Sequence, residues 1–425
     1  MAKGDGSITE VRRGVWRVCV SFGTDPVTGK RQKVQRNVQG TKAEARKERD
    51  RIRQEHENGL SFEAATVTFG EFAKLWQESR AATGELSTRT LKDGEYMVAC
   101  YSRFIGSVRL ADIDPRMVES LYAAIRKDKA DRGRPVGGTT MHKCHVVLKQ
   151  IMQKAVDHDL ILRNPCDRVK APKKDDPERR SLSVEEGARL LCCVDVAEEQ
   201  GFADFDAKEA RQTARGNLFG RVEVHGLYPI SNIIALRIGL ATGMRLGEVF
   251  GLSWGGVDLH QSCIQVSQQL STYGEITHPK SKAGIRTVFI DAATAAHLEK
   301  WKRRQAVELL KLGIKQNDST PVCCSDKGGW FNVQNFQRWW RPWRTERGFE
   351  GLKFHELRHT QATQLLANGV DVKTVQNRLG HSDASLTLNW YAHALPENDK
   401  RAADLVGNLF ASKPVETRII EVRTA

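Results

Sequence analysis

The stretch that decides the fold lies between residues 354 and 391 and consists of three short motifs, FHELRH (354–359), LGHS (379–382) and WY (390–391). These motifs supply His355, Arg358, His381 and Tyr391. His355 and Arg358 are three residues apart, a spacing that places both side chains on one face of a helix. Imidazole transfers protons near neutral pH, guanidinium matches the geometry of a phosphate, and a phenol can act as a nucleophile. The combination indicates chemistry on a phosphate group.

A related pattern lies upstream, in ATGMRLGE at residues 241–248. It adds Arg245 and, one helical turn later, Glu248, whose carboxylate we expect to orient the guanidinium. Further on, the segment PKSKAGI (279–285) joins two strand-like runs and carries Lys280 and Lys282 near its tip. Each signal is weak by itself, because a lone Arg-Leu-Gly-Glu turn is usually a surface helix and a lone histidine is usually a core residue. The interpretation therefore depends on the order of these motifs along the chain and not on any one of them.

This order of motifs resembles that of the tyrosine recombinases, the phage integrase family, throughout the C-terminal half of the chain. The resemblance implies a DNA strand transferase that uses neither a metal nor another cofactor. Tyr391 would attack the scissile phosphate and hold it as a 3′-phosphotyrosine ester. Arg245 and Arg358 would bind the phosphate oxygens, because a guanidinium donates in parallel to two of them.

The same resemblance assigns proton transfer to histidine and lysine side chains. His355 corresponds to the general base of the family, and His381 to a supporting donor to the phosphate. Lys280 corresponds to the lysine that protonates the leaving 5′ oxygen. Lys282, two residues further on, would point to the same side of a continued strand and is the rival for that role.

The N-terminal 60 residues read as three short strands followed by a charged helix from Lys42 to about residue 58. In the first long strand, Arg17 and its alternate neighbours fall on one face, and Val18 and its alternate neighbours on the other. The segment carries 14 Lys and Arg residues against 8 Asp and Glu residues. It resembles the arm-type DNA-binding domain of some integrases, which implies DNA contacts from Arg17, Arg31 and Lys33; a basic, solvated sheet is the alternative.

The fold class that we expect is multidomain and mainly α, with a small β-sheet-plus-helix N-terminal domain and a mixed α/β, mostly helical catalytic domain. Lys143 and Lys149 lie off the apolar stripes of the helical middle part and are candidates for phosphate contact. Residues 198–226 are polar and weakly periodic, and they read as an insertion without an assigned function. The expected divisions are an arm-type domain (1–62), a helical core-binding domain (66–168), a linker (169–180), a catalytic domain (181–412) and a tail (413–425).

Composition agrees with a nucleic-acid partner. The chain has 425 residues, a net charge of +14 and a pI near 9.4, a balance that favours a polyanion. Its nine cysteines form neither a CxxC pair nor a regular ladder, so we expect reduced thiols and no zinc site. No apolar run is long enough to span a bilayer. We therefore expect a cytoplasmic protein, associated with the nucleoid when bound to DNA and without a membrane partner.

The resemblance further implies partners and leaves alternatives open. The partners are double-stranded DNA at core and arm attachment sites, three further copies of the chain in a homo-tetramer, and in some cases a directionality factor or a host DNA-bending protein.

A prophage or other mobile-element integrase is the favoured interpretation. A conjugative-transposon integrase, a type IB topoisomerase-like enzyme and a catalytically silent DNA-binding regulator are the alternatives. A metal-dependent nuclease is disfavoured, because paired carboxylates that could hold two metal ions are not evident. The attachment-site sequence and the host are not encoded in any recognisable motif.

Overall fold

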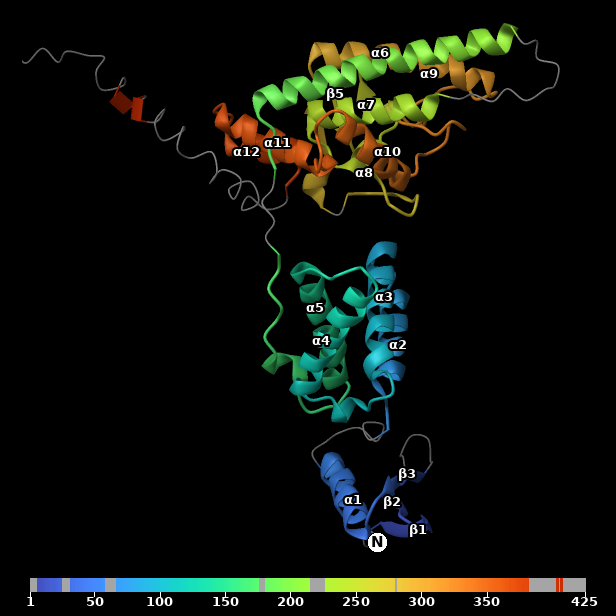
Figure 1. Ribbon diagram of the computed structural model, residues 1–425, viewed down its shortest axis with the longest axis vertical. Helices are drawn as coiled ribbons and strands as arrows, with labels where there is room; N and C mark the ends of the chain where they lie inside the picture. Colours follow the sequence, from blue (N-terminus) through green and yellow to red (C-terminus); the bar gives the residue numbers. More distant parts are fainter. Residues whose placement is uncertain are drawn as a thin grey trace, which may run out of the picture. The chain divides into compact units, whose positions relative to one another are not determined.

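The computed structural model describes residues 6–24, 31–57, 66–175, 180–214, 226–279 and 281–381, together with residues 403, 404, 406 and 407. For residues 32, 55–57 and 204–214 it describes the backbone only. The chain divides into two compact units, Met1–Pro177 and Glu178–Ala425. Figure 1 shows the elements of both.

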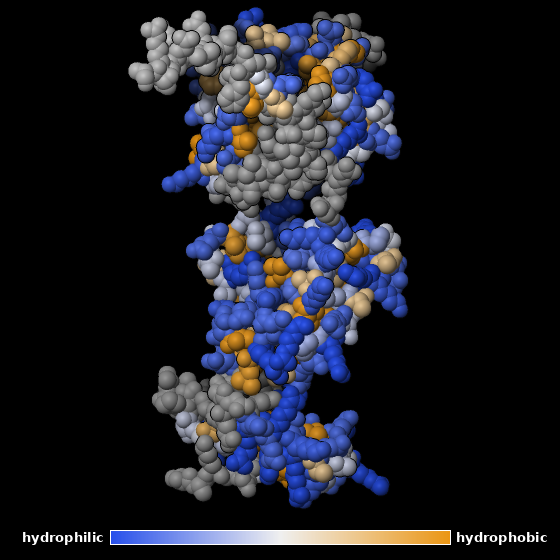
Figure 2. All heavy atoms as spheres, turned by 90° about the vertical axis from the view of Figure 1, so that its left-hand side faces the viewer, coloured by the Kyte–Doolittle hydropathy of each residue, from blue (hydrophilic) through white to orange (hydrophobic). Residues whose placement is uncertain are grey.

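The first unit begins with an antiparallel sheet of order β1-β2-β3, followed by a helix. The bounds are β1 Ser7–Arg12, β2 Val15–Thr24, β3 Arg31–Gln39 and α1 Lys42–Glu57. Val18, Val20 and Val34 are buried against Ala45 and Ile52 of α1. The strand alternation and the charged helix that the sequence predicts are confirmed, because the inward faces of β2 and β3 hold the buried valines. Figure 2 shows mainly hydrophilic side chains on the visible face of this module.

A bundle of four helices with two short 3-10 turns completes the first unit (Figure 1). The bounds are α2 Phe69–Ala82, α3 Thr88–Ile105, η2 Leu110–Asp112, α4 Pro115–Asp131, α5 Gly138–Asp157 and η3 Pro165–Arg168. Local signals set the starts of two helices: Thr68 caps α2 with Glu71 in a capping box, and Asp114 caps α4 with Pro115 at the first helical position. The buried Tyr101 hydroxyl donates to the Cys144 carbonyl at 2.7 Å and so ties α3 to α5.

The second unit is mostly helical. Its helices are α6 Val184–Ala214, α7 Leu227–Thr242, α8 Leu246–Phe250, α9 Ala292–Lys311, α10 Val333–Glu346, α11 Phe354–Ala367 and α12 Val372–Leu379. α7 is buried on nearly all sides and packs against α6, α8, α9 and α11 (Figure 1). Because it lies in the core, the end of α7 is a fixed point on which a site can be built.

Two small sheets lie between α8 and α9 in the sequence. The first has strand order β4-β5-β8, with β4 Val257–Asp258, β5 Cys263–Val266 and β8 Arg286–Phe289, and it is antiparallel throughout. The second pairs β6 Gln269–Leu270 with β7 Ile276–Thr277. The 3-10 turns η4 Trp254–Gly256 and η5 Lys282–Gly284 flank these strands. The loop between β7 and β8 is therefore the segment that carries both candidate lysines.

The structure shows that the first part of the predicted insertion at 198–226 is helical and continues α6. α6 begins with a capping box, in which Glu186 N donates to Ser183 Oγ at 3.1 Å and Ser183 N donates to Glu186 Oε2 at 3.1 Å. The helix then runs without a break to Ala214. Residues 202–214 are rich in Ala, Glu, Lys, Arg and Gln, so intrinsic helix propensity continues α6 although the apolar stripe has ended. Residues 215–225 lie outside the described part of the chain.

No helix in the described ranges is both long and apolar enough to cross a bilayer.

Candidate active site

Arg358 lies on α11 at the centre of the candidate site. Its side chain is 1 % exposed, and Nη1 donates to the carbonyl oxygen of Gly243 at 3.1 Å. The buried Nη2 has no hydrogen-bond partner among the residues that the structure describes. Burial, followed by the positive charge of Arg245, lowers the pKa of Arg358 to about 9. The fold thus holds a cation with an unused donor, a state that an anion would relieve.

The end of α7 receives three side chains from α11 and α12. In addition to the Arg358 bond, Gln361 Nε2 donates to the Leu240 carbonyl at 2.6 Å, and Arg378 Nη2 donates to the Ala241 carbonyl at 2.8 Å. These carbonyls belong to the last turn of α7, whose acceptors have no partner within the helix. The C-terminal end of a helix also carries partial negative charge, which favours guanidinium groups there.

Gly243 ends α7 in the left-handed conformation, with φ of +64°. A Cβ at this position would approach Leu379 Cδ2 to 2.7 Å and Gln361 Oε1 to 3.0 Å. Glycine is therefore required both by the backbone angle and by the close packing of α12. The turn that follows brings Arg245 to the same place.

Arg245 and Glu248 form an ion pair at the start of α8. Nη1 of Arg245 donates to Glu248 Oε1 at 2.8 Å, and its backbone N–H donates to Oε2 at 2.9 Å. Glu248 is 2 % exposed. Burial by itself would raise the pKa of Glu248, but hydrogen bonds and positive charge, chiefly from Arg286 and then from Arg245, lower it below its usual value. Glu248 is therefore a fixed carboxylate that orients Arg245.

His381 follows the C-cap of α12 and is 5 % exposed. The preceding Gly380 has φ of +66°, and its carbonyl accepts from Arg245 Nη2 at 3.3 Å. Burial, followed by the positive charges of Arg358 and Arg245, lowers the pKa of His381 to about 3. The imidazole is consequently neutral at cellular pH and can still donate one N–H.

The structure brings together Arg245 and Glu248 at the start of α8, Arg358 on α11 and His381 after α12, which are three separate segments. His355 begins α11, is exposed, and stacks edge to face on His359 with ring centroids 5.1 Å apart. Lys280 and Tyr391 lie outside the described residues. Lys282 is exposed at the start of η5, and the next residue of that turn lies close to Gly380, because a Cβ built on Gly380 would be 2.8 Å from the Ala283 carbonyl oxygen.

Two arginines of the site were not foreseen from the sequence. Arg286 of β8 donates Nη2 to Glu248 Oε2 at 2.9 Å. Arg378 of α12 donates Nη1 to the Phe289 carbonyl at 3.0 Å in addition to its bond to α7. One signal was available for Arg286: it alternates with the buried Val288 and therefore shares the inward face of the strand. Nothing local marks Arg378.

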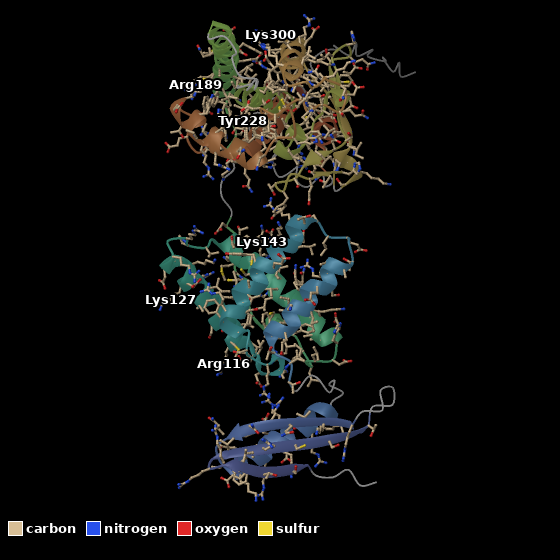
Figure 3. All side chains as sticks on the ribbon, turned by 90° about the vertical axis from the view of Figure 1, so that its right-hand side faces the viewer. Arg116, Lys127, Lys143, Arg189, Tyr228 and Lys300 are labelled. Carbon is tan, nitrogen blue, oxygen red and sulfur yellow. The ribbon has the colours of Figure 1, made fainter. Side chains whose placement is uncertain are left out.

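The candidate DNA-binding residues of the first unit differ in their surroundings. Arg17, Arg31 and Lys33 are all exposed; Arg17 Nε donates to Asn37 Oδ1 at 3.5 Å, and Arg31 Nε donates to Ser21 Oγ at 3.3 Å. Lys143 is exposed on α5 (Figure 3). Lys149 is held in an ion pair with Asp167 at 2.7 Å, so a phosphate contact from it would have to displace that carboxylate.

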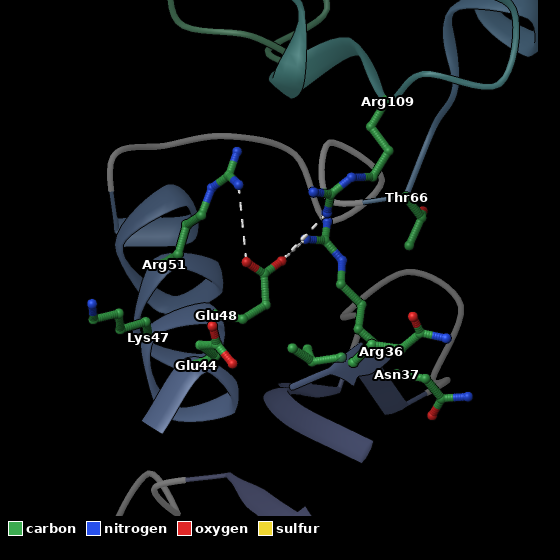
Figure 4. A pocket seen from close by; sticks show the side chains of 10 residues that line it. Arg36, Asn37, Glu44, Lys47, Glu48, Arg51, Thr66 and Arg109 are labelled. Carbon is green, nitrogen blue, oxygen red and sulfur yellow. Dashed lines mark hydrogen bonds and ion pairs between the residues drawn. The ribbon is translucent and has the colours of Figure 1, made fainter. Parts of the chain in front are cut away.

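A cavity of about 690 Å³ lies beside β3 and α1 in the first unit (Figure 4). The arginine cluster of the candidate site, formed by Arg245, Arg286 and Arg358, belongs to the second unit. The three arginines of the cavity are paired: Arg36 bonds Glu48, Arg109 Nη1 lies 3.4 Å from Glu48 Oε1, and Arg51 Nη2 lies 2.7 Å from Asp112 Oδ1. Burial raises the pKa of Glu48. We regard the charged lining of this cavity as a packing feature rather than as the reacting centre.

Among the described residues, no three or more His, Cys, Asp or Glu side chains are placed to hold a metal ion. The nine cysteines are free thiols.

Comparison with known proteins gives the class that this fold and this arginine cluster define. Residues 224–398 match the model of the phage integrase family, and residues 68–171 match the phage integrase SAM-like domain. The chain belongs to the phage integrase family. It is thus a tyrosine site-specific recombinase, of the kind found in mobile elements.

Two relatives match nearly the whole chain. A XerC-like tyrosine recombinase of Caldanaerobacter subterraneus is 25 % identical over 413 residues, covering 93 % of this chain and 96 % of the relative. The ICEBs1 integrase of Bacillus subtilis is 23 % identical over 412 residues, covering 95 % and 100 %.

Two solved structures share the fold. The Tn1549 transposon integrase in complex with a circular intermediate DNA has a TM-score of 0.60 at 17 % identity, covering 80 % of this chain and all of that chain. A lambda integrase dimer bound to a core site has a TM-score of 0.52 at 17 % identity, covering 90 % and 94 %.

Proposed function

We propose that this recombinase cleaves and rejoins DNA through a 3′-phosphotyrosine bond to Tyr391, and that it integrates and excises a mobile element. The observation that carries the proposal is the buried Arg358, whose Nη2 has no partner among the described residues, beside Arg245 and His381. A scissile phosphodiester would supply the missing acceptor and the missing negative charge. Two guanidinium groups aimed at the oxygens where charge develops are the arrangement that electrostatic catalysis requires.

In the proposed reaction the phenolic oxygen of Tyr391 forms a bond to phosphorus while the bond from phosphorus to the 5′ oxygen breaks. His355 takes the phenol proton, and the lysine of the β7–β8 loop gives a proton to the leaving 5′ oxygen. Neutral His381 donates a hydrogen bond to a phosphate oxygen. Attack by a 5′ hydroxyl on the phosphotyrosine then reverses these steps and joins the strands, so neither water nor a metal takes part.

The parts of the chain have separate tasks in this proposal. Residues 1–62 bind arm sites through Arg17 and Lys33, residues 66–168 clamp the core site through side chains such as Lys143, and residues 181–412 carry out the chemistry. Four copies act on two duplexes, with a directionality factor or a bending protein where excision requires one. The protein would work in the cytoplasm, on the nucleoid. The DNA partner is supported by the Tn1549 transposon integrase and the lambda integrase, whose solved structures are complexes with DNA.

Trapping on nicked suicide substrates tests the proposal. Purified protein is incubated with duplexes that span candidate core sites beside its own gene, and adducts that survive denaturant are sought. We expect an adduct that maps to Tyr391 on a 3′ phosphate and that chelators do not affect. Tyr391→Phe should bind the same DNA without forming it, and Arg358→Ala should lose cleavage with little loss of affinity, since many other phosphate contacts remain.

The same assay distinguishes the alternatives. Binding without any adduct would refute the proposal and indicate a silent DNA-binding regulator. Relaxation of a supercoiled plasmid that lacks an attachment site would indicate a topoisomerase. Single variants Lys280→Ala and Lys282→Ala identify the general acid, because only the variant that lacks it should lose most of the cleavage rate.

A further inference from the structure

Arg286, the first residue of β8, makes contact with three separate segments of the catalytic unit. Nε donates to the Arg378 carbonyl at 2.7 Å, at the end of α12. Nη1 donates to the Gly284 carbonyl at 3.1 Å, in the η5 turn, and Nη2 donates to Glu248 Oε2 at 2.9 Å. The side chain is 6 % exposed. Nη1 also donates to Glu248 Oε1 at 3.3 Å, so the guanidinium is committed to the end of α12, to the η5 turn and to both oxygens of Glu248.

These contacts fix the η5 turn against the segment that carries His381. A Cβ built on Gly380 would lie 2.8 Å from the Ala283 carbonyl oxygen and 3.0 Å from Cδ of Arg286. The turn and Gly380 are thus packed without space between them. The turn cannot move away unless the contacts of Arg286 break.

Glu248 is shared between Arg286 and Arg245. Its Oε1 accepts from Arg245 at 2.8 Å and its Oε2 accepts from Arg286 at 2.9 Å. A carboxylate with one partner would pair fully with Arg245 and oppose its contact with a phosphate. With two arginines on one carboxylate the group keeps a net positive charge, and Arg245 remains available to an anion.

We propose that Arg286 is a positioning residue that holds the lysine-bearing turn against the arginine cluster and that thereby couples protonation of the leaving oxygen to phosphate binding. The inference rests on the proposed function. The reaction is unchanged: the bond from Tyr391 to phosphorus forms, the bond to the 5′ oxygen breaks, and the proton reaches that oxygen from the loop lysine. Arg286 touches neither the substrate nor the reacting atoms.

A substrate whose leaving group needs no proton separates the role of Arg286 in proton donation from any other effect of the substitution. Single-turnover cleavage is measured on two suicide substrates, one with the ordinary bridging 5′ oxygen and one with a bridging 5′ sulfur at the scissile phosphate. A thiolate departs without a proton, so a defect in proton donation should disappear on sulfur. Arg286→Lys keeps the charge and removes the planar fork that reaches four acceptor atoms. We expect its rate to fall about 10²-fold on oxygen, the usual size of a general-acid effect, and only a few-fold on sulfur.

Matched variants serve as controls for the ratio of the cleavage rate on the sulfur substrate to the rate on the oxygen substrate. Lys280→Ala or Lys282→Ala, whichever removes the general acid, should show the same rescue by sulfur. Arg237 of α7 is also buried and also pairs with carboxylates, of Asp195 and Glu198, away from the cluster. Arg237→Lys should lower the melting temperature but keep the wild-type ratio. If Arg286→Lys does not melt cooperatively, Arg286→Gln, which keeps two amide hydrogens, is measured in the same way.

The outcomes separate the inference from the function on which it rests. Equal losses for the Arg286 variant on oxygen and on sulfur, or no loss on either, would overturn the positioning role while the recombinase chemistry stands. A wild-type protein that forms no adduct with either substrate would overturn the proposed function and this inference with it.

Discussion

Replacing Arg358 with methionine separates the catalytic contribution of its guanidinium from its cost to the fold. Methionine has a similar size, no charge and no polar hydrogen. The arginine is 1 % exposed, makes one hydrogen bond to the described part of the chain, and has a pKa lowered to about 9 by burial and by Arg245. Relative to an arginine in water, this lowered pKa means that the charged form of Arg358 is destabilised in the folded chain by about 5 kcal/mol.

The hydrogen bond to Gly243 acts in the opposite direction. A bond from a charged donor contributes about 1.5–3 kcal/mol. The difference predicts that Arg358→Met raises the free energy of unfolding of the DNA-free protein by roughly 2 kcal/mol, with a melting temperature higher by about 4–8 °C. Cleavage should fall by at least about 10²–10³-fold, because the phosphate loses a donor. A stabilising substitution that abolishes activity would show that the site is built for an anion.

Tryptophan fluorescence during thermal unfolding is a suitable assay, because seven of the nine tryptophans belong to the second unit. Arg237→Met is the matched control. It removes an equally buried arginine, but one that compensates Glu198, itself 1 % exposed, so it should destabilise by about 3–5 kcal/mol. If Arg358→Met destabilises the protein as much as Arg237→Met does, the guanidinium is already compensated without DNA and the reasoning is refuted.

Three further predictions concern neighbouring groups. Because the pKa of His381 is lowered to about 3, the folded chain binds fewer protons than the unfolded chain up to about pH 6.5, so stability falls as the pH drops through this window. His381→Gln should flatten this dependence by up to about 1.4 kcal/mol per pH unit, measured by denaturant unfolding at pH 5 and pH 7. Gly243→Ala should cost more than about 1 kcal/mol, because φ is +64° and Leu379 blocks the added methyl group, and calorimetry would show a lower melting temperature. Arg17→Gln and Lys33→Gln should each reduce the salt dependence of arm-DNA binding by about one phosphate contact and leave core cleavage unchanged, as filter binding and suicide-substrate assays would show.

Strand and helix periods made much of the fold predictable. In β2 the period of two placed Val18 and Val20 on the buried face and Arg17 on the exposed face, as the structure has them. Such a pattern is local, since each residue reports which side of the element meets the core. The length of α6 was not predicted, because its last turns lack an apolar stripe and depend on helix propensity.

The candidate site was predictable only where its residues recur in a known order. The spacing of His355 and Arg358 follows from one helical turn, and Glu248 follows Arg245 in the same way. Arg286 and Arg378 were not predicted as site residues, because their acceptors include main-chain carbonyls far away in the sequence, such as that of Phe289 for Arg378. A carbonyl has no sequence signature, so only the fold could show that these arginines belong to the cluster.

This dependence on carbonyls also explains how the chain folds before a phosphate arrives. Arg245, Arg286 and Arg358 crowd around a single buried carboxylate, Glu248, and their charges repel one another. The last turn of α7 reduces that cost, because the Gly243 carbonyl accepts from Arg358 at a helix end that carries partial negative charge. A carbonyl dipole compensates a guanidinium only in part, whereas a second carboxylate would compensate it fully and block the phosphate. Under the proposed function, the remaining unfavourable energy of the DNA-free site would be released when a phosphodiester binds, and it would add to the affinity where the strand is cut.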